Sequence, residues 1–408
     1  MTTNSPSSSA KPAGKTVANF DEAIDRVGTI CSKWDDMEAI YGVDPQDGIS
    51  MWVADMDFRP PQAVQKAVEA MAAHGVYGYP GEHTAYLDAI RWWMDNRHGW
   101  TVERDWIMSV HGLVNGTAIC VDAFTNPGDG VIIMTPVYHA FARVIRAAGR
   151  EVVELPLAER GGLYHLDWLN WQELLDGNEK MLVLCSPHNP GGRVWSAREL
   201  REIADFCKKN DLILVSDEIH HDLVMPESER HVVTAKAAPD LADRLVTLTS
   251  ATKTFNIAGA HIGNMIVSDP ALRAKLAAKL AAGGISPGLF GPNMVAAAYS
   301  PEGAQWVDAL VEYLDGNRRI FDEGISAIKG LRSMPLQATY LAWVDFSGTG
   351  MEPAEIAARI AKDAGIAANH GGTFGQGGAH FMRFNLATTR ANVVEAVKRL
   401  QAAFSDLQ

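Results

Sequence analysis

Four short apolar runs of the sequence are each followed by a side chain that could do chemistry: an aromatic ring, an amide, a carboxylate and an amine. In chain order the runs are 131–134, 181–185, 212–215 and 245–248, and the side chains are Tyr138, Asn189, Asp217 and Lys253. Ligands of an open parallel sheet bind outside the carboxyl ends of its strands. If the runs are neighbouring strands, we expect these side chains to meet at one site.

This set of side chains is what a pyridoxal phosphate site needs. A lysine forms a Schiff base with the cofactor and then moves the Cα proton of an amino acid. A carboxylate keeps the pyridinium nitrogen protonated, an aromatic ring stacks on the cofactor, and an amide holds its ring oxygen. Hydroxyls and backbone N–H groups at a helix N-terminus bind phosphate. Ser250 and Thr252 flank Lys253, and residues 111–118 form a glycine turn that opens a helix.

Each of these residues has a simpler explanation when it is taken alone. Lys253 is then a surface charge, Asp217 a helix N-cap, Asn189 a turn residue and Tyr138 packing. Arg383 lies in an apolar, strand-like run, where a buried guanidinium needs an anionic partner. The convergence of four strand ends favours the cofactor site over these explanations.

The elements that would position the site alternate between strands and helices. None of the four apolar runs alternates with polar residues, which is typical of strands covered on both faces. Helices are expected at 60–75 and at 196–209, where Ser196 and Glu199 form a capping box. The rhythm predicts an α/β fold with a mostly parallel sheet between helices.

The chain after Pro301 has a different pattern, with a long helix, strands at 339–346 and 380–387, and a helix at 353–364. We therefore expect a large α/β domain at 51–300 and a smaller α+β domain. The smaller domain would be built from 19–50 and 301–408, after a disordered tail at 1–18.

The composition argues against some binding partners and indicates the cellular compartment. The 408 residues include 36 Lys+Arg and 49 Asp+Glu, a formal net charge of −13 that argues against nucleic acid and anionic membranes. No apolar run approaches the ~18 residues that a membrane-spanning helix needs. The four cysteines form no CxxC pair, and the N-terminus lacks a secretory signal. These features predict a cytoplasmic protein.

Nine stretches together resemble the MalY/PatB-type cystathionine β-lyases (C–S lyases), a group of fold-type I pyridoxal phosphate enzymes. They are KWD (33–35), WVADMDF (52–58), YGYPG (77–81), PVYHAF (136–141), HNPGGRVW (188–195), SDEIHHDL (216–223), SATKTFNIAG (250–259), TYLAWVDF (339–346) and MRFNLA (382–387). They occur in the family's order over nearly the whole chain.

The resemblance implies pyridoxal 5'-phosphate as cofactor, an amino-acid substrate, and a homodimer with its active site at the subunit interface. Lys253 and Tyr138 would be catalytic. The cofactor would also contact Asp217, Asn189, His220, Gly112, Leu113, Ser250, Thr252 and, from the neighbouring subunit, Tyr79. Substrate would be bound by Arg383, Trp52, Ala54 and Asp55.

Two positions depart from the wider fold-type I pattern. His220 stands where many aminotransferases have tyrosine, as in the C–S lyase group. His261 stands where aminotransferases often place a phosphate-binding arginine, which leaves phosphate binding weaker or dependent on protonation of the histidine. The second departure mildly favours a lyase.

The expected function is a C–S β-lyase that converts L-cystathionine or another cysteine S-conjugate to pyruvate, ammonia and a thiol. The alternative is an aminotransferase, which shares the cofactor and the first proton transfer. A non-catalytic regulator is disfavoured by the complete set of cofactor groups. Residues 250–253 also fit the S-x-x-K motif of β-lactamases, but the partner motifs are absent.

A metal site is not expected. His220, His221 and Asp222 are the best candidates for metal ligands in the sequence. Adjacent residues do not share a helix face, and no third ligand motif accompanies them.

Overall fold

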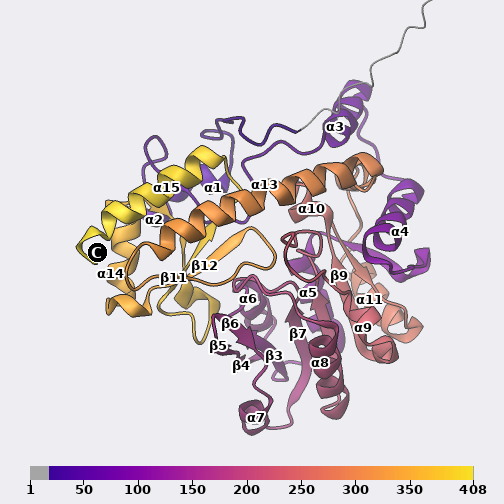
Figure 1. Ribbon diagram of the computed structural model, residues 1–408. Helices are drawn as coiled ribbons and strands as arrows, with labels where there is room; N and C mark the ends of the chain where they lie inside the picture. Colours follow the sequence, from indigo (N-terminus) through magenta and orange to yellow (C-terminus); the bar gives the residue numbers. More distant parts are fainter. Residues whose placement is uncertain (1–17, 408) are drawn as a thin grey trace, which may run out of the picture.

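A computed structural model describes residues 18–407 of the chain. The predicted tail at 1–18 lies outside this range except for its last residue. Figure 1 shows helices packed around a large sheet, with a second group of strands below two long helices, α13 and α15.

The large sheet has seven strands, and five adjacent ones are parallel. Its order is β2 (Ile107–Val110), β10 (Gly263–Ile266), β9 (Leu245–Thr249), β8 (Ile213–Asp217), β7 (Glu179–Cys185), β3 (Gly130–Thr135) and β4 (Glu151–Pro156). β10 is antiparallel to both of its neighbours, and β3, β4, β7, β8 and β9 run parallel. The four predicted strands are thus confirmed, as is the mostly parallel sheet.

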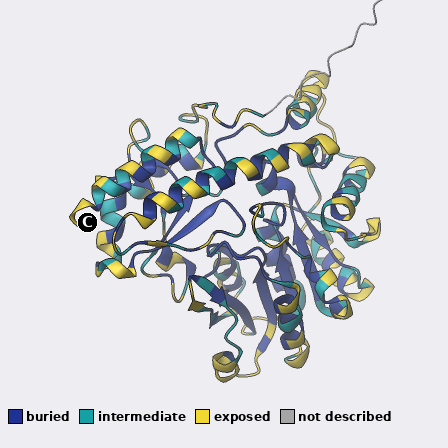
Figure 2. Cartoon of the chain, in the orientation of Figure 1, coloured by how far each residue is buried: buried dark blue, intermediate teal, exposed yellow. Residues whose placement is uncertain are grey.

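Helices cover both faces of this sheet, as the continuous apolar runs predict. In β3, Val131 and Ile133 pack with residues of α5 (Leu113–Phe124), α6 (Ala140–Ala147) and α11 (Pro270–Ala282). Ile132 and Met134 point the other way, toward α8 (Ala197–Lys209). Figure 2 shows the sheet strands as mostly buried and the outer helices as striped. This arrangement confirms the α/β class.

Local signals define several helix ends. Glu199 N donates to Ser196 Oγ, and Glu199 in turn accepts from Ser196 N, so α8 begins with the predicted capping box. α3 (Gln62–His74) ends at Gly75, whose φ of 73° is accessible to glycine.

The second sheet is antiparallel and lies under the two long helices. Its order is β11 (Arg332–Ser333), β12 (Leu341–Asp345), β15 (Phe381–Asn385) and β14 (Asn369–His370). α13 (Pro301–Ser326) and α15 (Arg390–Ala403) lie side by side above it (Figure 1). The predicted helix at 353–364 forms as α14 (Pro353–Ala358), which continues into a π-helical turn, Arg359–Asp363.

The N-terminal segment contacts the C-terminal part of the chain through a short parallel pair. β1 (Ile49–Ser50) pairs with β13 (Ile366–Ala367). This pairing agrees with a smaller domain built from both ends, but the domain boundaries at 50 and 300 stay a prediction.

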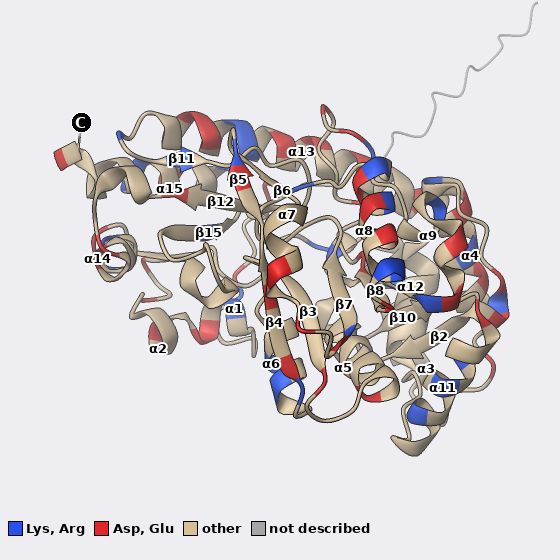
Figure 3. Ribbon diagram, turned by 90° about the horizontal axis from the view of Figure 1, so that it is seen from below, with Lys and Arg blue, Asp and Glu red and all other residues tan. Residues whose placement is uncertain are grey.

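The remaining elements surround these sheets. They are α1 (Ser32–Asp35), α2 (Met37–Tyr41), α4 (Thr84–His98), α7 (Trp168–Trp171), α9 (Thr234–Ala237), α10 (Ala251–Thr254), α12 (Phe290–Ala298) and the hairpin of β5 (Ala158–Arg160) with β6 (Leu163–His165). Acidic and basic residues are interspersed along the outer helices (Figure 3). Within residues 18–407, no helix combines the length and the apolarity needed to cross a membrane.

Candidate active site

A cavity of about 700 Å³ lies at the carboxyl ends of the parallel strands. Eleven of the predicted site residues line it: Trp52, Ala54, Gly112, Leu113, Tyr138, Asn189, Asp217, His220, Thr252, Lys253 and Arg383. The four side chains that follow the apolar runs therefore face one space, although they are spread over more than 100 residues of sequence.

Lys253 enters the cavity from α10, the short helix after β9. Ser250 begins this helix, because its Oγ accepts the N–H of Thr252 at 3.1 Å. The Nζ of Lys253 donates to the carbonyl oxygen of Ala54 at 2.5 Å. Burial lowers the pKa of Lys253 to about 8, and the positive charge of Arg383 acts in the same direction. A substantial share of the amine is therefore neutral near pH 8 and can act as a nucleophile or a base.

Asp217 is the last residue of β8 and is only 4% exposed. Burial raises the pKa of its carboxyl group to about 7, and the N–H of Ile219, donated to Oδ1 at 3.1 Å, opposes the shift. The simpler explanation of Asp217 as a helix N-cap is wrong, since turns rather than a helix follow β8. A cationic partner, such as a protonated pyridine nitrogen, would hold this carboxylate ionised.

Arg383 and Asn189 are joined directly. Arg383 donates from Nη1 to Asn189 Oδ1 at 3.0 Å, and from Nη2 to Asn369 Oδ1 at 2.5 Å and to the carbonyl oxygen of Trp52 at 2.9 Å. Its guanidinium lies 5.0 Å from the centre of the Phe374 ring. These contacts fix a fork of N–H donors at the cavity wall.

The Arg383 guanidinium is almost wholly buried and has no acidic partner among residues 18–407. It is 3% exposed, forms no ion pair with a described carboxylate, and its Nε has no hydrogen-bond partner. Burial lowers its pKa to about 10. A buried cation without a counter-ion is costly, so this site is suited to the carboxylate of a small ligand.

Tyr138 and His220 add rings to the cavity wall. Burial raises the pKa of Tyr138, so its phenol stays neutral. Burial also lowers the pKa of His220 well below its ordinary value, and its Nδ1 has no hydrogen-bond partner. The His220 ring lies edge-on to Tyr340, with centroids 5.9 Å apart. His220 is therefore a neutral, polar wall residue.

The N-terminus of α5 opens onto the same cavity. Gly112 caps the helix with φ 94°, a conformation that glycine tolerates, and no atom lies within 4 Å of the place a Cβ would take. Leu113, Thr252 and the exposed His261 also line the cavity. Backbone N–H groups at a helix N-terminus form a favourable anion site.

Three predicted residues are not brought to the cavity. Ser250 is buried and donates instead to the carbonyl oxygen of Ile262 at 2.8 Å. Tyr79 is fully exposed on its own chain. Asp55 points to Arg26, with its two oxygens each 2.9 Å from a guanidinium nitrogen. The predicted role of Tyr79 needs a second subunit, so the structure of one chain leaves it a prediction.

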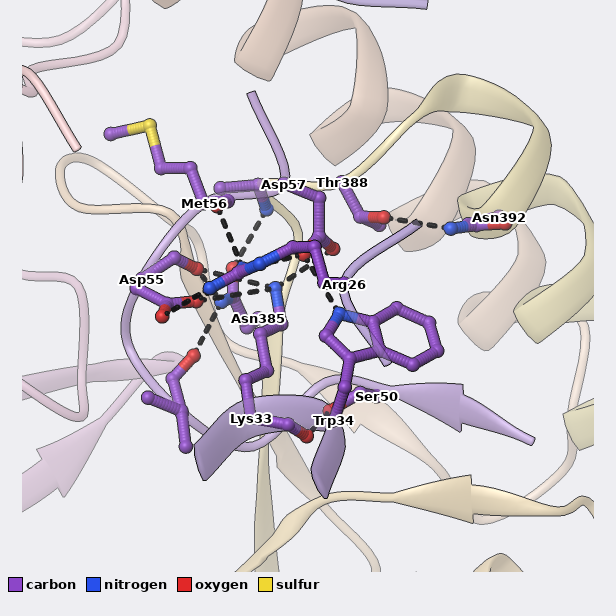
Figure 4. Close-up of polar contacts among 12 residues, drawn as sticks. Arg26, Lys33, Trp34, Ser50, Asp55, Met56, Asp57, Asn385, Thr388 and Asn392 are labelled. Carbon is purple, nitrogen blue, oxygen red and sulfur yellow. Dashed lines mark hydrogen bonds and ion pairs between the residues drawn. The ribbon is translucent and has the colours of Figure 1, made fainter. Parts of the chain in front are cut away.

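Asp55 instead helps to anchor the loop that carries Ala54 (Figure 4). The wholly buried Lys33 donates from Nζ to Asp57 Oδ2 at 2.9 Å, and Arg26 Nη1 donates to Asp57 Oδ1 at 2.8 Å. Both cations come from the segment before α1 or from α1 itself. Sequence reasoning missed this cluster, because a lone lysine near the N-terminus carries no signal of burial.

The residues present fit pyridoxal phosphate. The neutralisable Lys253 amine suits the aldehyde of the cofactor, the buried Asp217 carboxyl suits its ring nitrogen, and the glycine turn at Gly112 suits its phosphate. The unpaired Nε of Arg383 suits the carboxylate of a substrate. Residues 47–400 match the protein family described as "Aminotransferase class I and II". The chain belongs to the class I and II aminotransferase family.

Other proteins of this aminotransferase family are similar to this chain over nearly the whole length of both chains. Cystathionine β-lyase PatB of Bacillus subtilis (strain 168) is 37% identical over 95% of the chain and 100% of PatB. Cystalysin from Treponema denticola, whose structure contains pyridoxal 5'-phosphate, has 35% identity and a TM-score of 0.91 over 96% of this chain and 100% of its own. The pyridoxal-phosphate-bound C–S lyase of Staphylococcus hominis has 30% identity and a TM-score of 0.86 over 95% and 98%. These similarities confirm the predicted MalY/PatB-type group and the fold-type I architecture.

Two further residues of this aminotransferase-family site were missed from the sequence. Tyr340 donates from its hydroxyl to the carbonyl oxygen of Ala54 at 2.9 Å, and Asn369 accepts from Arg383. Tyr340 lies in the stretch 339–346, but nothing in the spacing indicates that its hydroxyl reaches a loop 286 residues earlier.

Proposed function

We propose that the protein is a pyridoxal-phosphate-dependent carbon–sulfur β-lyase. It would cleave L-cystathionine, or a related cysteine S-conjugate, with water to pyruvate, ammonia and a thiol. The observation that carries the proposal is that Lys253, Asp217 and Arg383 face one cavity with perturbed pKa values. The lyase names of PatB and of the Staphylococcus hominis enzyme support this choice within the family.

We assign the cofactor contacts to the predicted residues. Lys253 would hold the cofactor covalently, Asp217 would pair with the pyridinium nitrogen, and Tyr138 would stack on the ring. The phosphate would be held by Gly112, Leu113, Thr252 and, less directly, Ser250. Asn189 would bond the ring oxygen while it holds Arg383 in place. His220 would pack beside the ring as a neutral group.

When bound, pyridoxal phosphate supplies an electron sink for the bond that breaks at the substrate Cα. The chain's own residues do the positioning and the proton transfer. Arg383 would bind the α-carboxylate with its fork of donors, and Trp52 and Ala54 would line the substrate side. The neutral Lys253 amine would remove the Cα proton, because its lowered pKa allows it to accept a proton near neutral pH. Loss of the β-thiolate then follows.

An aminotransferase is the second candidate, favoured by the family match itself. The two reactions share the substrate carboxylate site and the Cα proton transfer by Lys253. They differ in whether a β-leaving group departs before the proton returns. The geometry of the described residues suits both reactions.

Product analysis distinguishes the two functions. The purified holoenzyme would be incubated with L-cystathionine alone, and separately with an amino donor followed by a 2-oxo acid. Catalytic release of pyruvate and a free thiol without a 2-oxo acid supports the lyase. Formation of one pyridoxamine phosphate per site, reversed by a 2-oxo acid, supports the aminotransferase. The proposal is overturned if neither assay yields a product.

We also infer a homodimer in the cytoplasm. Tyr79 is fully exposed, and Val76 and Tyr77 just before it in sequence are exposed as well. The exposed ring of Phe290 contacts that of Tyr77, and this apolar surface suits cover by a second subunit. The four cysteines are free thiols, in agreement with a reducing compartment. Light scattering would test the dimer, and loss of cofactor affinity in Tyr79→Phe would support a contribution across the interface.

A further inference from the structure

Two histidines and an aspartate form a buried cluster behind the cavity wall. His98 is the last residue of α4, and His221 and Asp222 lie in the turn after β8. One nitrogen of each ring and one carboxylate oxygen all lie within 4.8 Å of one another. The side chains of His221 and Asp222 have no exposed area, and that of His98 is 6% exposed. None of the three lines the cavity.

A hydrogen bond to Asp222 satisfies the His98 ring, but the His221 ring has no hydrogen bond in the described chain. The Nε2 of His98 lies 3.0 Å from Asp222 Oδ1 with hydrogen-bond geometry. The Nε2 of His221 is 3.1 Å from Asp222 Oδ2, yet neither of its ring nitrogens has a hydrogen-bond partner in the described chain. The Nδ1 of His221 is therefore buried without a polar partner, and its Nε2 has only the nearby carboxylate oxygen, outside hydrogen-bond geometry, which is unfavourable for a buried imidazole. The His221 ring is thus incompletely satisfied beside a carboxylate and a second imidazole.

Neighbouring groups orient the carboxylate, as the residues around metal ligands commonly do. Trp93 donates from Nε1 to Asp222 Oδ1 at 3.0 Å, and Thr254 donates from Oγ1 to Asp222 Oδ2 at 2.9 Å. These donors hold both oxygens of the buried Asp222 carboxylate in place beside the two imidazoles.

We propose that His98, His221 and Asp222 bind one divalent transition-metal ion of the zinc type. Two imidazoles and one carboxylate suit Zn²⁺, Co²⁺ or Ni²⁺, whereas Ca²⁺ requires six to eight oxygen ligands. The expectation of no metal site considered only ligands close in sequence, and His98 lies 124 residues before Asp222.

The proposed ion would have a structural role. It would join the end of α4 to the turn after β8. Asp217, just before this turn, and His220, within it, both line the cavity. Asp222 also holds Thr254, the neighbour of Lys253. Metal binding would therefore stiffen the support of the cavity without taking part in the reaction.

The test uses tag-free holoenzyme that has been treated with chelator and then dialysed. Titration with Co²⁺ is followed by the visible d–d bands at wavelengths where the cofactor does not absorb, and Zn²⁺ content is measured by mass spectrometry after gel filtration. We expect one ion per chain, with Zn²⁺ displacing Co²⁺ and raising the thermal unfolding midpoint. Failure of the wild-type protein to retain either metal overturns the proposal.

Variants locate the ion. His98→Gln keeps a donor for Asp222 but not an imidazole, and His221→Phe removes both nitrogens while filling the space. Both should lose stoichiometric Co²⁺ and the midpoint shift, while the exposed His74→Gln control keeps them. Each variant is first checked for native circular dichroism and for cofactor absorbance. Folded variants that still bind one ion overturn the proposal, and the result is independent of the lyase assay.

Discussion

The Nζ of Lys253 donates to the carbonyl oxygen of Ala54, 199 residues earlier in the chain, at 2.5 Å. Tyr340 donates to the same oxygen at 2.9 Å, so the helix that follows β9 and the residue that precedes β12 meet the 52–57 loop at one backbone atom. The orientation of the lysine amine therefore depends on a loop that is itself anchored by Lys33 and Arg26. The site is assembled from both ends of the chain.

Asp217→Asn should lower kcat for any amino-acid substrate by about 100-fold, while the cofactor still binds. An amide cannot keep the pyridine nitrogen protonated, and loss of one preorganised electrostatic contact costs about 3 kcal/mol of transition-state stabilisation. Steady-state kinetics with absorbance of the bound cofactor would measure both effects. An unchanged kcat would contradict the pairing of Asp217 with the cofactor.

Arg383→Lys should raise KM more than it lowers kcat, with kcat/KM falling by about 30- to 100-fold. Lysine keeps the charge but loses the planar fork, which is worth roughly 2–3 kcal/mol of charge-assisted hydrogen bonding. A matched amine substrate without the carboxylate should be turned over equally by both proteins. Equal losses with both substrates would show that Arg383 acts by supporting the cavity wall.

The rate at which the apoenzyme captures pyridoxal phosphate should rise with pH through about 8. The neutral amine is the form that attacks, and burial lowers the pKa of Lys253 from 10.5 to about 8, so the rise ends well below pH 10. At pH 7 roughly one amine in ten is neutral. Stopped-flow absorbance between pH 6.5 and 10 would show the profile, and a rise that continues past pH 10 would contradict the lowered pKa.

Much of the fold and the heart of the site could be predicted from the sequence. Apolar runs such as 181–185 mark buried strands, and the carboxyl ends of parallel strands lie at one edge, so Asn189, Asp217 and Lys253 could be brought together before any coordinates. The resemblance then added Arg383, which lies on a strand of the other sheet and follows no such run.

The supporting contacts could not be predicted in this way. Lys33 and Asp57 are ordinary charged residues in sequence, and only the folded chain buries them together. The same holds for His98 and Asp222, whose partnership depends on how α4 packs. Periodicity and motif spacing describe local structure, whereas these pairs depend on the packing of distant segments.

Lys33→Met should lower the free energy of unfolding by about 3 kcal/mol, because it leaves the buried Asp57 carboxylate with Arg26 as its remaining cationic partner. Asp57 has a pKa below its ordinary value, so its stabilising contribution is present at neutral pH and is lost as the pH falls. Urea unfolding at pH 7 would measure the loss. Lys66→Met on the exposed face of α3 is the control, with a change within about 0.5 kcal/mol.

The central claim is that Lys253 carries pyridoxal phosphate in the strand-end cavity. The most direct measurement is borohydride reduction of the purified holoenzyme, followed by digestion and mass spectrometry of the peptides. We predict one pyridoxyl phosphate group per chain, on the peptide that contains Lys253, and none in Lys253→Ala. A protein that holds no cofactor, or holds it on another lysine, would contradict the account.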